Sequence, residues 1–149
     1  MRFVVQRVTS ASCTVDGKVT GKIEKGFVVL VGIADSDTQQ TADKMVKKLI
    51  GLRIFADAEG KTNLALADVD GGLLVISQFT LYADCKKGNR PSFTRAGKPE
   101  FANEMYEYIL SACQKEISVV ERGIFGADMK IELLNDGPFT VILDSDEIC

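Results

Sequence analysis

The 149-residue sequence predicts a single α/β domain in layers, a β/β/α arrangement with mixed, largely antiparallel sheets and two main helices. Three observations lead to this prediction. Runs of β-branched and aromatic residues alternate with two segments of helical periodicity. The composition, 46% hydrophobic and 26% charged, is typical of a folded domain. No linker or internal repeat divides residues 1–149.

The first third of the chain is predicted to form a β-meander. Strands are expected at residues 3–8, 11–15, 18–23 and 27–31. Asp16-Gly17 separates the second strand from the third, and Asp-Gly favours a two-residue hairpin turn because both residues tolerate positive φ there. Residues 27–31 are apolar without interruption, which indicates a strand buried on both faces.

Two helices with one apolar face each are predicted. The first is capped by the short polar side chains of residues 35–37, and the second begins near Pro99 and runs to about Glu116. Their core positions recur at helical spacing: Ala42, Met45, Val46, Leu49 and Ile50 in the first, and Phe101, Met105, Ile109, Ala112 and Cys113 in the second. Further strands are expected at residues 53–55, 73–79, 119–122, 129–134 and 139–143.

The amino-acid composition limits the catalytic and metal-binding chemistry that the chain can perform. The chain has no histidine, so the usual general base, the usual partner of a Ser or Cys nucleophile and the commonest zinc ligand are all missing. Its four cysteines form no Cys-x-x-Cys pair. We therefore expect neither a metal nor another cofactor. Cys113 and Met129 lie in apolar periodic stretches, which favours a core role for both.

Charge and hydropathy limit the possible partners and the possible cellular location of the protein. A net charge of −3 argues against nonspecific coating of nucleic acid. The first apolar run is broken by Gln6 and Arg7, unlike a secretory signal, and no apolar stretch approaches the roughly 20 residues that span a bilayer. The expectation is a cytoplasmic protein that does not enter a membrane.

Ser77-Gln78-Phe79-Thr80 ends the apolar strand expected at residues 73–79. At a strand end the backbone N–H groups and the Ser, Gln and Thr side chains can converge on one point, as a catalytic site requires. The ordinary explanation for such a strand end is structural, with Ser77 and Thr80 only satisfying backbone groups. The segment alone does not decide between the two.

Asn135-Asp136-Gly137-Pro138 is a dense cluster of turn-forming residues between two expected strands. A plain turn explains it. The functional alternative rests on the observation that only about 5–6% of X–Pro bonds in folded proteins are cis, and that these tend to be deliberate features. The sequence leaves the isomer of Gly137-Pro138 open.

A basic stretch occupies residues 86–98. It contains no acidic residue, includes Phe93, and carries five cations: Lys86, Lys87, Arg90, Arg95 and Lys98. Such a run is explained either as a solvated loop or as a clamp for phosphates near an RNA end.

These segments together resemble a known family. Ser77-Gln78-Phe79-Thr80 before Leu81, and the segment Asn-Asp-Gly-Pro-Phe-Thr at residues 135–140, are similar to the two signature motifs of the D-aminoacyl-tRNA deacylases. The resemblance extends through residues 5–8 (Val-Gln-Arg-Val), 87–93 (Lys-Gly-Asn-Arg-Pro-Ser-Phe) and 125–130 (Phe-Gly-Ala-Asp-Met-Lys). It covers essentially the whole chain in order.

The resemblance implies a homodimer with sites built across the interface. Gly137-Pro138 would be cis and would reach into the partner's pocket, where its carbonyls would meet the α-amino group of the substrate. Ser77, Gln78, Phe79 and Thr80 would hold the terminal adenosine and the ester. Arg7 would brace the Gly-Pro turn. The substrates implied are D-aminoacyl-tRNA and glycyl-tRNA, which makes the activity chiral proofreading in translation. Contact with the tRNA is assigned to Lys86, Lys87 and Arg90.

The expected mechanism needs no strong base. An aminoacyl ester beside a ribose 2′-hydroxyl is already reactive, so positioning it and stabilising its oxyanion can suffice. The N–H groups of Phe79 and Thr80 are the candidate oxyanion donors, and the substrate's 2′-hydroxyl would help to activate water. Rigid carbonyls would exclude one hand of amino acid by steric clash and would admit glycine, which has no side chain to exclude.

Two alternatives remain open. The hydroxyl of Thr80 could act as a covalent nucleophile, although no adjacent base is evident in the sequence. The chain could also be a noncatalytic module that binds an RNA end through residues 86–98. Release of the amino acid from a D-aminoacyl-tRNA would distinguish a hydrolase from such a module.

Overall fold

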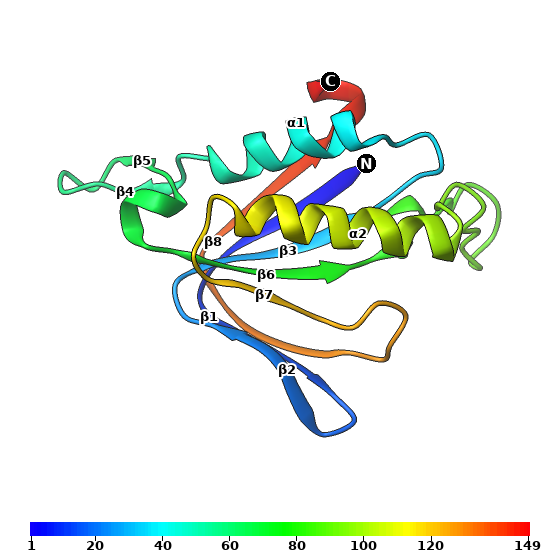
Figure 1. The fold of residues 1–149 in the computed structure, drawn as a ribbon, viewed down its shortest axis with the longest axis horizontal. Coiled ribbons are helices and arrows are strands. Elements are labelled where there is room, and N and C mark those ends of the chain that lie inside the picture. Colours follow the sequence, from blue (N-terminus) through cyan, green and yellow to red (C-terminus); the bar gives the residue numbers. More distant parts are fainter.

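The computed structural model describes residues 1–149 and places two main helices on one side of a curved sheet (Figure 1). The strands of this sheet are β1 (Arg2–Val15), β2 (Lys18–Ile23), β3 (Gly26–Gly32), β6 (Gly72–Ser77), β7 (Val120–Arg122) and β8 (Lys130–Asp144). A separate pair is formed by β4 (Phe55–Ala56) and β5 (Thr62–Leu64). The helical elements are α1 (Gln39–Ile50), α2 (Pro99–Gln114), α3 (Ser145–Ile148) and the 3-10 turns η1 (Leu66–Val69) and η2 (Phe79–Tyr82).

β1 holds the large sheet together. The strand order is β2-β1-β3-β6-β7, and β8 pairs with the other edge of β1. β1 is antiparallel to all three of its partners, whereas β6 is parallel to β3 and to β7. The sheet curls until its two edge strands, β2 and β7, meet. At this contact the Thr20 hydroxyl of β2 donates a 3.1 Å hydrogen bond to the backbone oxygen of Arg122 in β7. The expected α/β class, with a mixed, largely antiparallel sheet and two main helices, is confirmed.

Apolar side chains fill both sides of the sheet. The larger cluster lies between the sheet and the helices and includes most of the predicted helix core, while Ile50, Phe101 and Ala112 are only partly buried at its margin. The smaller cluster, which includes Cys13, fills the inside of the curl. The buried hydroxyl of Tyr106 in α2 donates a 2.7 Å hydrogen bond to the backbone oxygen of Val75, which fixes α2 to β6.

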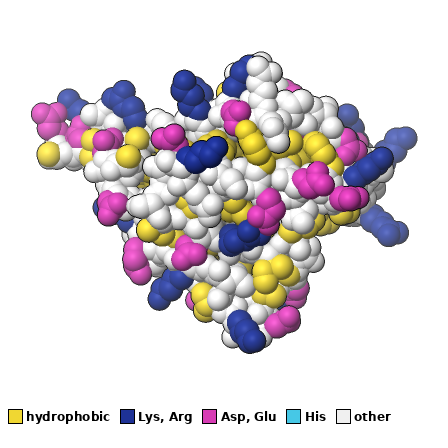
Figure 2. Space-filling model, in the orientation of Figure 1, with side chains coloured by type: hydrophobic (Ala, Val, Ile, Leu, Met, Phe, Trp, Pro, Cys, Tyr) yellow, Lys and Arg dark blue, Asp and Glu magenta, His cyan; other side chains and the backbone are white.

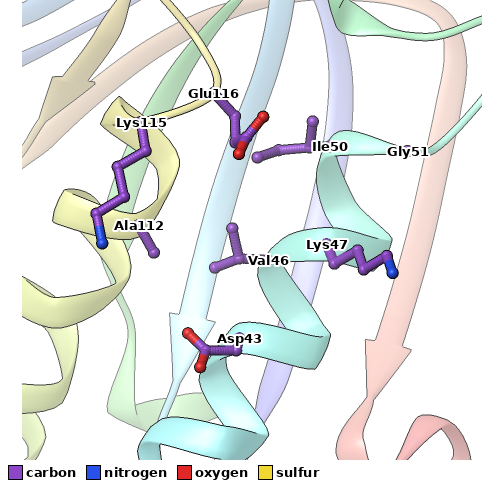
Figure 3. Close-up of a pocket in the computed structure, with 8 residues that line it drawn as sticks. All are labelled: Asp43, Val46, Lys47, Ile50, Gly51, Ala112, Lys115 and Glu116. Atoms are coloured by element: carbon purple, nitrogen blue, oxygen red, sulfur yellow. The ribbon is translucent and has the colours of Figure 1, made fainter.

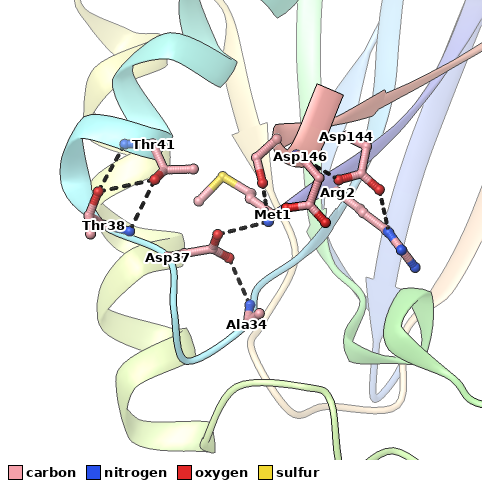
Figure 4. A network of polar contacts seen from close by, with 9 residues as sticks. Met1, Arg2, Ala34, Asp37, Thr38, Thr41, Asp144 and Asp146 are labelled. Carbon is pink, nitrogen blue, oxygen red and sulfur yellow. Dashed lines mark hydrogen bonds and ion pairs between the residues drawn. The ribbon is translucent and has the colours of Figure 1, made fainter. Parts of the chain in front are cut away.

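The start of α1 differs from the prediction. The N-cap is Thr38, which forms a capping box with Thr41, and not one of residues 35–37 (Figure 4). Asp37 is buried and accepts hydrogen bonds of 2.8 Å from the Met1 ammonium and from the N–H of Ala34. Its carboxylate is occupied by a buried cation that lies 36 residues away, so it is not free to cap the helix.

Two other boundaries were predicted from local signals with different success. α2 begins at Pro99, as expected for a proline in the first helical turn. β6, however, ends at Ser77 and not at residue 79. The N–H of Gln78 still donates to Val31 of β3, and the N–H of Leu81 then returns to the Gln78 oxygen and closes η2. No helix in the structure is long and apolar enough to cross a membrane.

The prediction of separate strands at residues 129–134 and 139–143 is wrong. β8 is one strand, paired with β1 on both sides of an irregularity. Gln6 pairs with Thr140, Val8 with Asn135 and Ser10 with Leu134, so across two register shifts β1 advances by four residues where β8 advances by six. β8 therefore has two extra residues, which bulge from the ladder, and Gly137-Pro138 lies in this bulge and not in a turn between strands.

The close approach of β3 and β6 gives a testable prediction. A Cβ built on Gly26 would lie 1.9 Å from the backbone oxygen of Gly72. Because neither strand can move without breaking the parallel ladder, Gly26→Ala should destabilise the protein by about 3 kcal/mol or more in urea unfolding. Lys25→Ala, at the exposed neighbouring position, should change stability by less than about 0.5 kcal/mol. Equal stability of the two variants would contradict the packing described here.

Candidate active site

The segment from Ser77 to Thr80 leaves the sheet and becomes exposed. Ser77 is the last residue of β6 and pairs with Val31, and Gln78 is the residue before η2. Phe79 and Thr80 are the first two residues of η2 and are exposed. The four predicted residues therefore form one continuous patch at the carboxyl end of a buried strand.

Polar groups at this patch face solvent with few internal partners. The first N–H groups of a helix have no acceptor within it, and Gln78 makes no side-chain cap, so the N–H groups of Phe79 and Thr80 lack a helical acceptor. The Gln78 side-chain amide donates a 2.5 Å hydrogen bond to the Thr80 hydroxyl oxygen. An amide is not a base, and no carboxylate or lysine is hydrogen-bonded to this hydroxyl. The arrangement can bind an oxyanion but lacks the base that a threonine nucleophile needs.

Arg2 and Asp144 support η2 from the sheet. The Arg2 guanidinium donates to Asp144 at 2.7 Å and to the backbone oxygen of Leu81 at 3.1 Å, and it stacks 4.9 Å from the ring centre of Tyr82. Partial burial acts to raise the pKa of Asp144, but the N–H of Asp146 and the Arg2 guanidinium together hold that pKa below its ordinary value. No local signal in the sequence connects Arg2 with Asp144, because the two residues lie 142 positions apart.

Arg7 contacts the bulge of β8 directly. Its Nε donates a 2.9 Å hydrogen bond to the backbone oxygen of Asp136, and its guanidinium lies 4.8 Å from the ring centre of Phe139. Another guanidinium nitrogen donates to the backbone oxygen of Ile54. The Gly137-Pro138 peptide bond is cis, and Gly137 has a φ of 129°. Arg7 thus joins both sides of the bulge, and Phe139, for which the sequence suggested no role, provides its stacking surface.

The two predicted halves of the site lie apart within one chain. The bulge of β8 lies opposite Arg7 of β1. Arg7 pairs with Phe27 of β3, and Phe27 pairs with Leu73 near the start of β6. Ser77 lies four residues further along β6, at the other end of the strand (Figure 1). Three strand spacings of about 4.8 Å and four residues of about 3.3 Å separate the segments by roughly 20 Å. One copy of the chain does not bring them into contact.

The basic loop lies beside the first half of the site. Asp84 and Ser92 form a bridge at 2.7 and 2.9 Å, and the residues between them, including Lys86, Lys87 and Arg90, are exposed. Figure 2 shows Lys and Arg side chains projecting at the end of the molecule where Figure 1 draws this loop. The three predicted tRNA-binding residues are therefore neighbours of η2 and not of the bulge.

A surface groove lies elsewhere and contains none of the predicted site residues. It has a volume of about 520 Å³ and runs between α1 and α2 (Figure 3), lined by Asp43, Val46, Lys47, Ile50, Gly51, Ala112, Lys115 and Glu116. Asp43 is already hydrogen-bonded to the Tyr108 hydroxyl at 2.8 Å. The groove offers no set of converging reactive groups, so the candidate site is the patch at η2.

No group of three or more Cys, Asp or Glu side chains is placed to hold a metal ion. Burial raises the pKa of the Cys113 thiol to about 12, so this cysteine stays protonated at neutral pH. Cys113 is fully buried in the larger cluster, and Met129 packs partly buried against the smaller one.

Comparison with known sequences identifies the family. A sequence model of the family described as D-Tyr-tRNA(Tyr) deacylase matches residues 4–144. The chain belongs to this family. It is 52% identical over 146 residues to a D-aminoacyl-tRNA deacylase of Flavobacterium johnsoniae, with 97% of each chain covered. It is 50% identical over 149 residues to a D-aminoacyl-tRNA deacylase of Thermosipho melanesiensis, with 99% of each chain covered.

Solved structures share the deacylase fold. The c-Myc DNA Unwinding Element Binding Protein superposes with a TM-score of 0.91 at 40% identity, covering 97% of this chain and 98% of that one. A probable eukaryotic D-amino acid tRNA deacylase superposes with a TM-score of 0.82 at 16% identity, covering 95% and 97%. The second likeness is one of fold alone, and it shows that the curved sheet with two helices persists at low identity.

The Arg2–Asp144 pair gives a prediction about acid stability. A carboxylate whose pKa is lowered on folding stabilises the protein above its unfolded pKa, near 4, and this contribution is lost as pH falls through the folded value. Asp144→Asn keeps an oxygen to cap α3 but removes the charge, so it should cost about 1–2 kcal/mol at pH 7 and less at pH 3.

Urea unfolding of the wild type and of Asp144→Asn at both pH values would measure this difference. The matched control is Asp128→Asn, because Asp128 pairs with Lys130 on the exposed surface and such pairs contribute little. A loss for Asp144→Asn that is the same at pH 3 and pH 7 would show that the charge is not the cause.

Proposed function

We propose that this chain hydrolyses D-aminoacyl-tRNA at a site assembled from two copies of itself, with η2 supplied by one copy and the Gly137-Pro138 bulge by the other. The reaction itself follows from family membership and from 50–52% identity to D-aminoacyl-tRNA deacylases over nearly the full length. The chain is therefore an ester hydrolase. The assembly of the site and the course of the reaction are the new parts of the proposal.

One observation carries the two-copy site. The bulge and η2 lie roughly 20 Å apart in one chain, so a single pocket that uses both requires a second copy. β8 also offers a surface for that copy, because its outer edge has no partner strand and it exposes Leu134 and Ile142, at 62% and 67%. An unpaired edge strand with exposed apolar side chains is typical of an interface.

The proposed chemistry uses the backbone. The N–H groups of Phe79 and Thr80 would stabilise the oxyanion formed when water attacks the ester carbonyl. The substrate's 2′-hydroxyl would orient this water, and the Thr80 hydroxyl, which already accepts from Gln78, would have its own proton free to donate to the substrate. Ser77 and Gln78 would hold the terminal adenosine.

Selection between D- and L-amino acids would come from the bulge of the partner copy. Arg7 fixes the Asp136 oxygen and stacks on Phe139, so the carbonyls around Gly137-Pro138 are held on a rigid support. Carbonyls directed at the α-amino group and Cα leave no room for the side chain of an L-amino acid. Glycine presents no side chain, so glycyl-tRNA would enter as well. Lys86, Lys87 and Arg90 would contact the phosphates of the tRNA.

The direct test compares the hydrolysis of D-tyrosyl-tRNA with that of L-tyrosyl-tRNA. We expect release of D-tyrosine with a kcat/KM at least about 100-fold above that for the L-form, followed as loss of labelled amino acid from the tRNA. Glycyl-tRNA should also be hydrolysed. Binding of D-tyrosyl-tRNA without release would instead favour a noncatalytic RNA-end-binding module, and equal rates for both hands would remove the selection mechanism.

Thr80→Ala distinguishes backbone catalysis from a covalent threonine. If the hydroxyl only binds substrate, kcat/KM for D-tyrosyl-tRNA should fall by no more than about tenfold, the loss of one hydrogen bond. A nucleophile would lose a factor on the order of 10⁴ or more. Single-turnover rates of the wild type and the variant would measure the ratio, and trapping of an acyl-enzyme would contradict the proposal.

Complementation between two defective variants tests the shared site. Thr80→Trp blocks η2, and Gly137→Val strains the bulge, because Gly137 has positive φ and its Cβ would lie 3.0 Å from the Arg7 guanidinium. Each variant alone should lose most activity. After co-expression, half the dimers are mixed and each mixed dimer has one intact site, so about one quarter of wild-type activity should return. Variants of the same segment, Thr80→Trp with Gln78→Trp, should not complement.

A further inference from the structure

Phe79 and Phe93 form an exposed aromatic pair beside the candidate site. Their ring centres lie 5.0 Å apart at an interplanar angle of 69°, an edge-to-face contact. Phe79 is 56% exposed and Phe93 is 37% exposed, although aromatic rings of this size are usually withdrawn from water. In the proposed site the N–H of Phe79 binds the ester oxyanion, and the ring of the same residue contacts Phe93. The pair therefore connects the ester site to the basic loop.

The position of Phe93 is fixed by backbone contacts on both sides. Its preceding residue, Ser92, is bridged to Asp84, and the N–H of Ala96 donates to the Phe93 oxygen at 3.0 Å. The N–H of Gly97 donates a 2.8 Å hydrogen bond to the backbone oxygen of Ile33, just after the end of β3, and the N–H of Lys98 donates one of 2.8 Å to the Asp35 carboxylate. The ring is thus presented by an anchored loop, which lowers the entropic cost of binding a base.

Unpaired cations surround this aromatic pair. Five basic side chains lie between residues 86 and 98, and none of them forms an ion pair or a side-chain hydrogen bond. The acidic side chains at the base of the loop, Asp84 and Asp35, accept from the backbone N–H groups of Lys86 and Lys98. Cations next to exposed aromatic rings are the combination with which proteins hold single-stranded nucleic acid: the rings stack on bases while the cations follow the phosphates.

We infer that Phe93 and the basic loop bind the single-stranded nucleotides that precede the terminal adenosine of the tRNA. This inference rests on the proposed function. The terminal adenosine and its ester belong to the patch at η2, so the chain of nucleotides that leaves this patch over the Phe79 ring reaches Phe93 first. A base stacks there, and Lys86, Lys87 and Arg90 bind the phosphates that follow. Phe93 is a positioning residue, since it contacts the substrate away from the reacting bond.

Two substrates separate this role from a role in the ester site. D-tyrosyl-tRNA carries the preceding nucleotides, whereas the 3′-ester of D-tyrosine with adenosine lacks them. For Phe93→Leu, the ratio of kcat/KM on the tRNA to kcat/KM on the adenosine ester should fall about tenfold, as expected for one lost stacking contact. Phe93→Tyr keeps an aromatic ring and should restore the ratio. Thermal melting of both variants checks that they fold.

Salt dependence tests the cations with a matched control. Replacing Lys86, Lys87 and Arg90 together by alanine should reduce the slope of log kcat/KM against log salt for D-tyrosyl-tRNA by about two, as for three lost contacts to a single strand. The same replacement of Lys44, Lys47 and Lys48, which are exposed on α1, changes the net charge equally. This control should leave the slope unchanged.

The outcomes distinguish a failure of this inference from a failure of the proposed function. If the wild type hydrolyses both substrates but Phe93→Leu leaves their ratio unchanged, or if both triple variants change the slope equally, the inference fails and the proposed function stands. An equal loss on both substrates would place Phe93 in the ester site and would also overturn the inference. If the wild type hydrolyses neither substrate, the proposed function fails and the inference fails with it.

Discussion

Backbone pairing along β1 is the constraint on which the rest of the structure depends. β1 has a partner on each edge for most of its length, so the positions of β2, β3 and β8 all follow from its register. The same strand also carries the two guanidinium groups that support the candidate site. Arg2 holds η2 through Leu81 and Tyr82, and Arg7 holds the bulge of β8 through Asp136 and Phe139. One strand therefore fixes both segments that the proposed reaction needs.

Sequence reasoning succeeded where the determinants are local. The hairpin turn at Asp16-Gly17, the start of α2 at Pro99 and the apolar face of α1 depend on neighbours within a few residues, and the structure contains all three. It failed where distant pairing overrides local preference. Residues 135–138 have the composition of a turn, but pairing with β1 on both sides makes them a bulge in one strand. The capping role expected for residue 37 was also wrong, because a distant ammonium group binds Asp37.

The candidate site was partly accessible from sequence for the same reason. Its segments could be named through a family resemblance, but their separation of roughly 20 Å within the chain depends on strand order and register. Nothing local shows that Arg2 contacts Asp144 or that Arg7 stacks on Phe139. A site whose chemistry rests on backbone N–H and carbonyl groups is also hard to read from side chains. The absence of histidine did indicate a role for backbone groups, because it removes the usual general base.

The bulge in β8 has a consequence for how the chain can evolve. Side chains alternate between the two faces of a strand, and because β8 has an even number of extra residues, its two halves keep the same alternation of side chains relative to β1. Loss or gain of one residue in the bulge would force one half of the strand to present its other face to the core. A point substitution in the bulge changes one side chain, whereas an insertion or deletion of one residue changes the orientation of every side chain in one half of the strand. The length of this segment should therefore drift more slowly than its composition.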